Sequence, residues 1–150
     1  MKGFTLIIMG LVLTLFLSTC GEESAIPGTG IVDLSNEAQV ITVAAGSYTN
    51  VSPAGLAQML EDKDFPLINV HIPYEGEIDG TDEFVPFNEI EANLGRFPTD
   101  KDKRVVVYCR SGSMSAQAAQ TLVELGYTDV WNLDGGMIAW QNSGRSLLDQ

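Results

Sequence analysis

The clearest pattern in the chain is a short apolar run that leads through a polar loop into a helix-like segment. Residues 104–108 are mostly β-branched or aromatic and show no polar alternation, which is typical of a strand buried on both faces of a parallel sheet. Beyond the loop, apolar residues recur at helical spacing, namely Ala118, Ala119, Leu122 and Val123. Gly126 follows as a typical helix end. The pattern predicts a strand, a tight loop and a helix in this order.

Weaker patterns of the same kind predict the elements on either side. Ser52 and Pro53 are typical of a helix start, and residues 62–66 end that helix. The other predicted elements are strands over 67–70, 84–87 and 129–133 and helices over 88–94 and from Asp134 to Gly144. Strands covered on both faces, with helices between them, favour an α/β fold.

The loop after the first of these strands carries the candidate chemistry. Cys109 is placed at the carboxyl end of its strand, the edge where open α/β sheets bind ligands. The following residues, Ser111, Gly112 and Ser113, are small enough for the backbone to curl around the sulfur. A helix that begins near Ser113 presents unpaired amide N–H groups and a partial positive charge to this loop.

These neighbours make Cys109 the candidate nucleophile. The helix N-terminus and Arg110 both stabilise a thiolate, the reactive form of cysteine. The alternative is an inert buried thiol. No packed core requires a loop of Arg, Ser and Gly, so the sequence favours a reactive thiol.

Two other features lie near this predicted edge. His71 follows the strand over 67–70 and is a candidate for lining the site, with a hydrogen-bonded structural histidine as the alternative. Residues 74–91 contain seven acidic residues and no basic one, which predicts a solvated loop. A calcium site or a surface for a basic partner is a weaker explanation of the acidic segment.

Composition narrows the function further. The 150 residues suffice for one domain and a processed leader. The net charge of −12 argues against nucleic acid as a partner. The only two cysteines are Cys20 and Cys109, which excludes a disulfide framework and a cysteine-rich metal site.

The N-terminal segment predicts export. Residues 4–17 form an apolar run that is too short to span a bilayer but suits the core of a signal peptide. The run ends in Leu-Ser-Thr-Cys-Gly at 17–21, which resembles the lipobox of bacterial lipoproteins, in which the cysteine becomes acylated. Thr19 is less usual there than Gly, Ala or Ser. Ordinary signal cleavage after Ala25 and a buried helix are the alternatives.

We therefore expect three parts in the chain. Residues 1–20 form a signal peptide, residues 21–46 a tether with a candidate edge strand at 40–45, and residues 47–150 the domain. Lipidation at Cys20 would anchor the protein, outside the cytoplasm, to the cell membrane or outer membrane.

Two segments carry a family resemblance. CRSGSMS at 109–115 and LVELGYTDVWNLDGGMIAW at 122–140 resemble the rhodanese homology domain of sulfurtransferases, and the likeness extends from about 51 to 144. It implies a three-layer α/β domain with a five-stranded parallel sheet flanked by helices. It also implies that Cys109 carries sulfane sulfur as a persulfide and passes it to a thiophilic acceptor. The backbone amides of 110–115 would line the pocket, formed by Arg110, Ser111, Gly112, Ser113, Met114 and Ser115.

The resemblance also implies partners. They are a small sulfur-containing anion or thiol and a protein that accepts sulfur, besides the membrane reached through the lipid anchor. No metal or organic cofactor is required. A phosphatase, which also uses a Cys loop at a helix N-terminus, needs Arg six residues after the Cys, and that position is Ser115.

This chain departs from the family pattern at three places. Met114 stands where family loops often carry Arg, and Asn69-Val70-His71 replaces an Asp-x-Arg pattern. Glu77 stands where a His is common. The pocket is therefore expected to be less cationic than in members that use thiosulfate well. The alternative function is a non-catalytic rhodanese-like module that binds a partner or senses redox state or persulfide.

Overall fold

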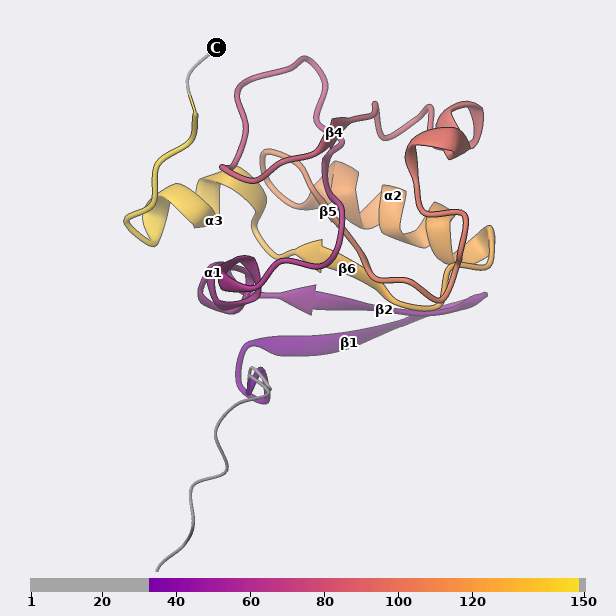
Figure 1. Ribbon diagram of the computed structural model, residues 1–150, viewed down its shortest axis with the longest axis horizontal. Coiled ribbons are helices and arrows are strands. Elements are labelled where there is room, and N and C mark those ends of the chain that lie inside the picture. The colour runs from indigo at the N-terminus through magenta and orange to yellow at the C-terminus, as the bar shows by residue number, and fades with distance from the viewer. Residues whose placement is uncertain (1–32, 149–150) are drawn as a thin grey trace, which may run out of the picture. The chain divides into compact units, whose positions relative to one another are not determined.

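The computed structural model describes residues 33–148, which contain a six-stranded sheet flanked by helices (Figure 1). The strands are β1 Ala38–Val43, β2 Gly46–Val51, β3 Leu67–Asn69, β4 Glu83–Phe84, β5 Val105–Tyr108 and β6 Val130–Leu133. The helices are α1 Pro53–Glu61, α2 Ser113–Glu124 and α3 Gly136–Asn142, and a 3-10 helix, η1, covers Glu91–Arg96. The strand order in the sheet is β1-β2-β6-β5-β3-β4, which places β5 in its interior.

Three layers follow from the alternation of side chains along the strands. Val105 and Val107 of β5 belong to a buried cluster that includes the apolar face of α2. Val106 and Tyr108 belong to a second cluster with α1 and α3. Figure 1 accordingly shows α2 and α3 on opposite sides of β5. The prediction of an α/β sheet flanked by helices is confirmed.

The strand count and the start of the domain differ from the prediction. The sheet has six strands and not five, because β1 pairs with β2 in an antiparallel hairpin, with Ala38 opposite Val51 and Val43 opposite Gly46. Residues 38–46 of the expected tether therefore form part of the sheet, the candidate edge strand at 40–45 corresponds to β1, and the domain begins before residue 47. The β1 side chains are exposed or half-buried, as suits an edge strand, and Val40 is 66% exposed.

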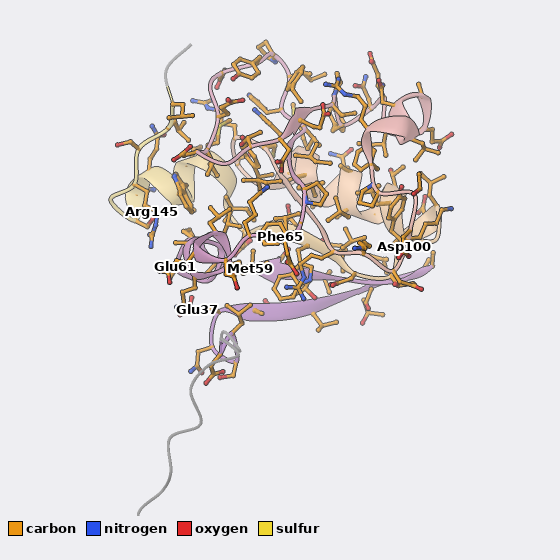
Figure 2. The ribbon with its side chains drawn as sticks, viewed as in Figure 1. Glu37, Met59, Glu61, Phe65, Asp100 and Arg145 are labelled. Atoms are coloured by element: carbon orange, nitrogen blue, oxygen red, sulfur yellow. The ribbon has the colours of Figure 1, made fainter. Side chains whose placement is uncertain are left out.

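Contacts at Glu37 explain why the chain before residue 47 is ordered. The main-chain N–H of Ser52 donates to the Glu37 carbonyl at 2.8 Å, and the Ser52 hydroxyl donates to the Glu37 carboxylate. Ser52 is also the N-cap of α1, and its hydroxyl accepts from the Gly55 N–H at 3.0 Å, as the helix-start signal predicts. Figure 2 shows Glu37 at the start of β1. The predicted signal peptide over 1–20, with Cys20, lies outside the described residues.

The central motif folds as its pattern predicts. Helix α2 begins at Ser113, and Gly126 follows its end with φ of +91°. The Gly126 N–H donates to the Val123 carbonyl and the Tyr127 N–H donates to the Leu122 carbonyl, both at 3.0 Å. This is the hydrogen-bond pattern of a glycine-ended helix, with Tyr127 buried against the last turn.

The segment between β3 and β5 is less regular than predicted. The strand expected over 84–87 is reduced to β4, Glu83–Phe84, which pairs with β3. Pro86 lacks an N–H group for a longer ladder. The helix expected over 88–94 is the 3-10 helix η1.

Candidate active site

The sulfur of Cys109 is buried, but it lies among hydrogen-bond donors. Cys109 follows directly after β5 and is 1% exposed. Its Sγ accepts from the main-chain N–H of Gly112 at 3.1 Å and from the hydroxyl of Ser115 at 3.4 Å. The Ser115 hydroxyl has one proton and also lies 3.2 Å from the Gly112 carbonyl, so it donates to one of these acceptors at a time. The two donors favour a negative charge on the sulfur.

The backbone of the loop joins the sulfur to a helix N-terminus. Gly112 has φ of +88°, and its carbonyl accepts the first hydrogen bond of α2 from the Ala116 N–H at 2.9 Å. The amides of Ser113, Met114 and Ser115 precede that bond and have no partner within the helix. The partial positive charge of the α2 N-terminus is therefore placed at the Cys109 loop.

Helix α3 holds the same loop from the other side. The Met137 N–H donates to the Cys109 carbonyl and the Ile138 N–H donates to the Arg110 carbonyl, both at 2.9 Å. This approach requires glycine at 136, because a Cβ there would be 2.2 Å from the Cys109 carbonyl oxygen. Sequence reasoning assigned no site role to these residues. The consecutive glycines at 135 and 136, inside the segment with the family resemblance, are the sequence signal from which this close approach of α3 could have been predicted.

A carboxylate from another segment forms an ion pair with Arg110, the cationic residue of the loop. Glu75 Oε2 lies 3.0 Å from Arg110 Nε, and the same oxygen lies 3.5 Å from His71 Nε2. The Arg110 and Glu75 side chains are 58% and 42% exposed. His71 is only 6% exposed, and neither of its ring nitrogens has a hydrogen-bond partner. Sequence reasoning missed Glu75, which it assigned to a solvated acidic loop.

Buried amide and phenol groups fix the segment that carries Glu75. Asn69 Oδ1 accepts from the His71 N–H, and Asn69 Nδ2 donates to the Gly76 carbonyl, both at 3.0 Å. The Tyr108 hydroxyl accepts from the Ile78 N–H at 3.1 Å. Burial raises the pKa of Tyr108 to about 12. These contacts fix the backbone at Gly76 and Ile78, directly after Glu75.

The structure brings the predicted site residues to one edge of the sheet. Cys109 and residues 110–115 follow β5, and His71 follows the adjacent strand β3. Arg110, Ser111 and Ser113 are exposed, Gly112 and Met114 are half-buried, and Ser115 is fully buried. Met114 packs against the buried cluster that contains Cys109. Arg110 is the one charged residue between 110 and 115.

The part of the chain that the structure describes has neither a metal-binding group nor a membrane-spanning helix. Within 33–148, His, Cys, Asp and Glu side chains form no group of three or more that could hold a metal ion. Over the same range, every helix is too short or too polar to cross a bilayer.

Known proteins resemble this chain both in the sequence that includes the Cys109 loop and in the fold. Residues 52–143 match the family described as "Rhodanese-like domain". A protein of Allochromatium vinosum named "Sulfurtransferase" is 38% identical over 102 residues, which are 65% of this chain and 92% of that protein. A protein of Shewanella oneidensis named "Thiosulfate sulfurtransferase GlpE" is 36% identical over 102 residues, which are 65% of this chain and 96% of that protein.

A solved structure shows the same arrangement of elements. The crystal structure of a rhodanese-like domain protein from Staphylococcus aureus aligns with a TM-score of 0.56 and 27% identity, covering 67% of this chain and 97% of that chain. The family match spans more than half of the chain and includes both the Cys109 loop and the glycines that support it. The chain therefore belongs to the rhodanese-like sulfurtransferase family.

Proposed function

We propose that this protein transfers sulfane sulfur through a persulfide on Cys109. The observation that carries the proposal is the pair of hydrogen bonds to Cys109 Sγ, from the Gly112 amide and the Ser115 hydroxyl. The names of the relatives from Allochromatium vinosum and Shewanella oneidensis support the same chemistry. The donor is thiosulfate or another sulfane-sulfur compound, and the acceptor is a thiophile such as cyanide, a small thiol or a protein.

The reaction has two displacement steps. The Cys109 thiolate attacks the outer sulfur of thiosulfate, a new S–S bond forms, and sulfite leaves with the electron pair of the broken S–S bond. The enzyme then carries Cys–S–S⁻. Cyanide attacks the outer sulfur, thiocyanate leaves, and the Cys109 thiolate is restored. Charge and atoms balance in both steps, and neither needs an oxidant, a reductant or a cofactor.

The loop supplies what these steps require. The donors at Sγ stabilise the thiolate before attack and again when the acceptor removes the outer sulfur. After the first step the negative charge moves to the outer sulfur. The amides of Ser113, Met114 and Ser115, at the N-terminus of α2, supply the positive potential for that charge.

A transfer assay tests the proposal. Purified full-length protein is mixed with thiosulfate, or separately with cysteine persulfide, and thiocyanate formation from cyanide is measured. We expect turnover that Cys109→Ser abolishes and that Cys20→Ser preserves, since Cys20 is outside the matched range of 52–143. Absence of transfer from both donors, or equal transfer by Cys109→Ser, would refute the proposal.

A second candidate is a persulfide or redox sensor without turnover. The observation in its favour is the burial of Cys109, which is 1% exposed and so is reached by a bulky acceptor only after local opening of the loop. A sensor would take one sulfur atom per chain in a single exposure to donor and release it slowly. Steady-state thiocyanate formation at many turnovers per chain would exclude this candidate.

We also propose that the domain acts outside the cytoplasm on a lipid anchor at Cys20. The support is the apolar run over 4–17 followed by the lipobox-like 17–21, all outside the described residues. The test is metabolic labelling with a fatty acid in a bacterial host, followed by cell fractionation. The label is expected in the membrane-bound wild type and absent from Cys20→Ala. A labelled Cys20→Ala protein, or an unlabelled wild type, would contradict the anchor.

A further inference from the structure

We propose that Glu75 selects the sulfur donor, by neutralising Arg110 so that the site disfavours dianions such as thiosulfate and prefers organic persulfides. The inference rests on the proposed function and specifies its substrate class. In the reaction with a persulfide, the Cys109 thiolate attacks the outer sulfur of R–S–SH. Cys–S–SH forms, and the thiolate R–S⁻ leaves with the electron pair of the broken bond.

The charge arrangement beside the sulfur is the starting point. Arg110 is the residue after Cys109 and the one charged side chain between 109 and 115. Its Nε lies 3.0 Å from the Glu75 carboxylate, so its charge is compensated before any substrate arrives. Among the other cations of the described residues, Lys63 pairs with Asp82, Arg96 with Glu83 and Arg104 with Asp129. Arg145 lies over the Trp140 ring, and it lines the same cavity as Glu75 but not the Cys109 loop.

Glu75 is held where it can compensate this charge. The backbone just after it is fixed, because the buried Asn69 side chain donates to the Gly76 carbonyl at 3.0 Å. Glu75 Oε2, the oxygen that pairs with Arg110, also lies 3.5 Å from His71 Nε2. The carboxylate is therefore placed between side chains that follow two adjacent strands, β3 and β5.

The compensation is reversible. Glu75 lines an open cavity of about 620 Å³, whose other lining residues are Gly76, Gln141, Arg145, Ser146, Leu147 and Leu148. The carboxylate is 42% exposed and has room to rotate away from Arg110. A dianion must displace it to reach the guanidinium and is repelled while it remains. A persulfide, with at most one negative charge on its reacting sulfur, meets a smaller barrier.

The size of this effect follows from electrostatics. One unit charge acting on a dianion about 6–8 Å away, at the dielectric constant of water, changes affinity by about fivefold to tenfold at low ionic strength. Salt screens exposed charges, so the factor decreases as ionic strength rises. Because both partners are exposed, Glu75 sets a preference among donors and does not exclude one absolutely.

The experiment compares Glu75→Gln with Asp79→Asn, an exposed acid on the same segment whose replacement changes the net charge equally. With Cys109 intact, kcat/KM is measured with thiosulfate and with cysteine persulfide. We expect Glu75→Gln to raise kcat/KM for thiosulfate about fivefold, mainly through a lower KM, and to change the persulfide value less than twofold. Asp79→Asn should change neither. The gain should shrink in high salt and should be lost in the double variant Glu75→Gln/Arg110→Gln.

A binding measurement separates failure of this proposal from failure of the proposed function. In the Cys109→Ser background, thiosulfate is titrated while the NMR signals of the loop amides are followed. Tighter binding with Glu75→Gln, but not with Asp79→Asn, supports donor selection even if the wild type shows no turnover. Equal binding and equal thiosulfate kcat/KM in the wild type and Glu75→Gln would overturn it, even if Cys109-dependent transfer is fully present.

Discussion

Gly136 lies so close to Cys109 that a Cβ at 136 would be 2.2 Å from the Cys109 carbonyl oxygen. Through this contact the first amides of α3 reach the backbone of the loop, with the Met137 N–H donating to the Cys109 carbonyl at 2.9 Å. The position of the sulfur thus depends on two helices, since the N-cap Gly112 and Ser115 of α2 supply the donors to Sγ and α3 holds the main chain that carries it.

Gly136→Ala should damage both stability and activity. The added methyl meets backbone atoms that cannot rotate away, and φ at 136 is +58°, which strains any residue with a Cβ. We expect a loss of about 2–4 kcal/mol in the free energy of unfolding, measured by urea denaturation, and loss of sulfur transfer.

Gly144→Ala is the matched control for this clash. Gly144 also has a positive φ, +85°, but a Cβ there would have no atom within 4 Å. We expect a loss of about 1 kcal/mol from backbone strain alone and unchanged transfer. Equal losses in the two variants would show that the approach of α3 to the loop is not specific.

Ser115→Ala tests the side-chain donor at the sulfur. Ser115 is fully buried, and its hydroxyl is 3.4 Å from Cys109 Sγ, so alanine removes one donor with little change in volume. We expect transfer to fall up to about tenfold, which corresponds to the loss of one hydrogen bond of ordinary strength. Ser113→Ala, at an exposed position in the same turn, controls for a change in the helix start. A Ser115→Ala protein as active as wild type would place all stabilisation on the backbone amides.

The Cys109 motif was predictable because its signals are local. A buried strand, small residues at 111–113 and an apolar stripe ending at Gly126 each act over a few residues, and the structure has strand, loop and helix where those signals put them. The fold class followed from the same local patterns together with the family resemblance.

What sequence reasoning missed depends on contacts between distant segments. Glu75 and Arg110 are far apart in the chain, and nothing in the acidic segment distinguishes Glu75 from its neighbours. Strand β1 overlaps the candidate edge strand at 40–45, but the pattern alone left that strand inside a tether, because its exposed side chains do not show whether it joins the sheet. Its place is fixed by pairing with β2 and by the contact of Glu37 with Ser52.

The buried phenol of Tyr108 predicts a pH dependence of stability. The folded state raises the pKa of Tyr108 from 10.0 to about 12, chiefly because burial disfavours the charged phenolate. Between these values the unfolded chain has lost the proton that the folded chain retains. Stability is therefore undiminished below pH 10 and should fall as pH rises from 10 to 12, by an amount on the order of 2 kcal/mol.

Tyr108→Phe isolates this contribution. The variant should be less stable at neutral pH by about 1–2 kcal/mol, since the Ile78 N–H loses its acceptor. Its stability should fall less steeply than that of wild type between pH 10 and 12, in urea titrations at each pH. Burial also raises the pKa of Tyr74 and Tyr127, but both remain in the variant and cancel in the comparison. Parallel pH profiles would contradict the assignment.

Formation of the persulfide is measured by the mass of the peptide that contains Cys109 after the protein is mixed with a sulfane-sulfur donor. Thiosulfate and cysteine persulfide are each added to excess, the donor is removed, and the digest is analysed without reductant. We expect a gain of one sulfur atom on Cys109, which cyanide removes as an equal amount of thiocyanate. If the Cys109 peptide keeps its original mass with both donors, sulfur transfer through this residue is contradicted.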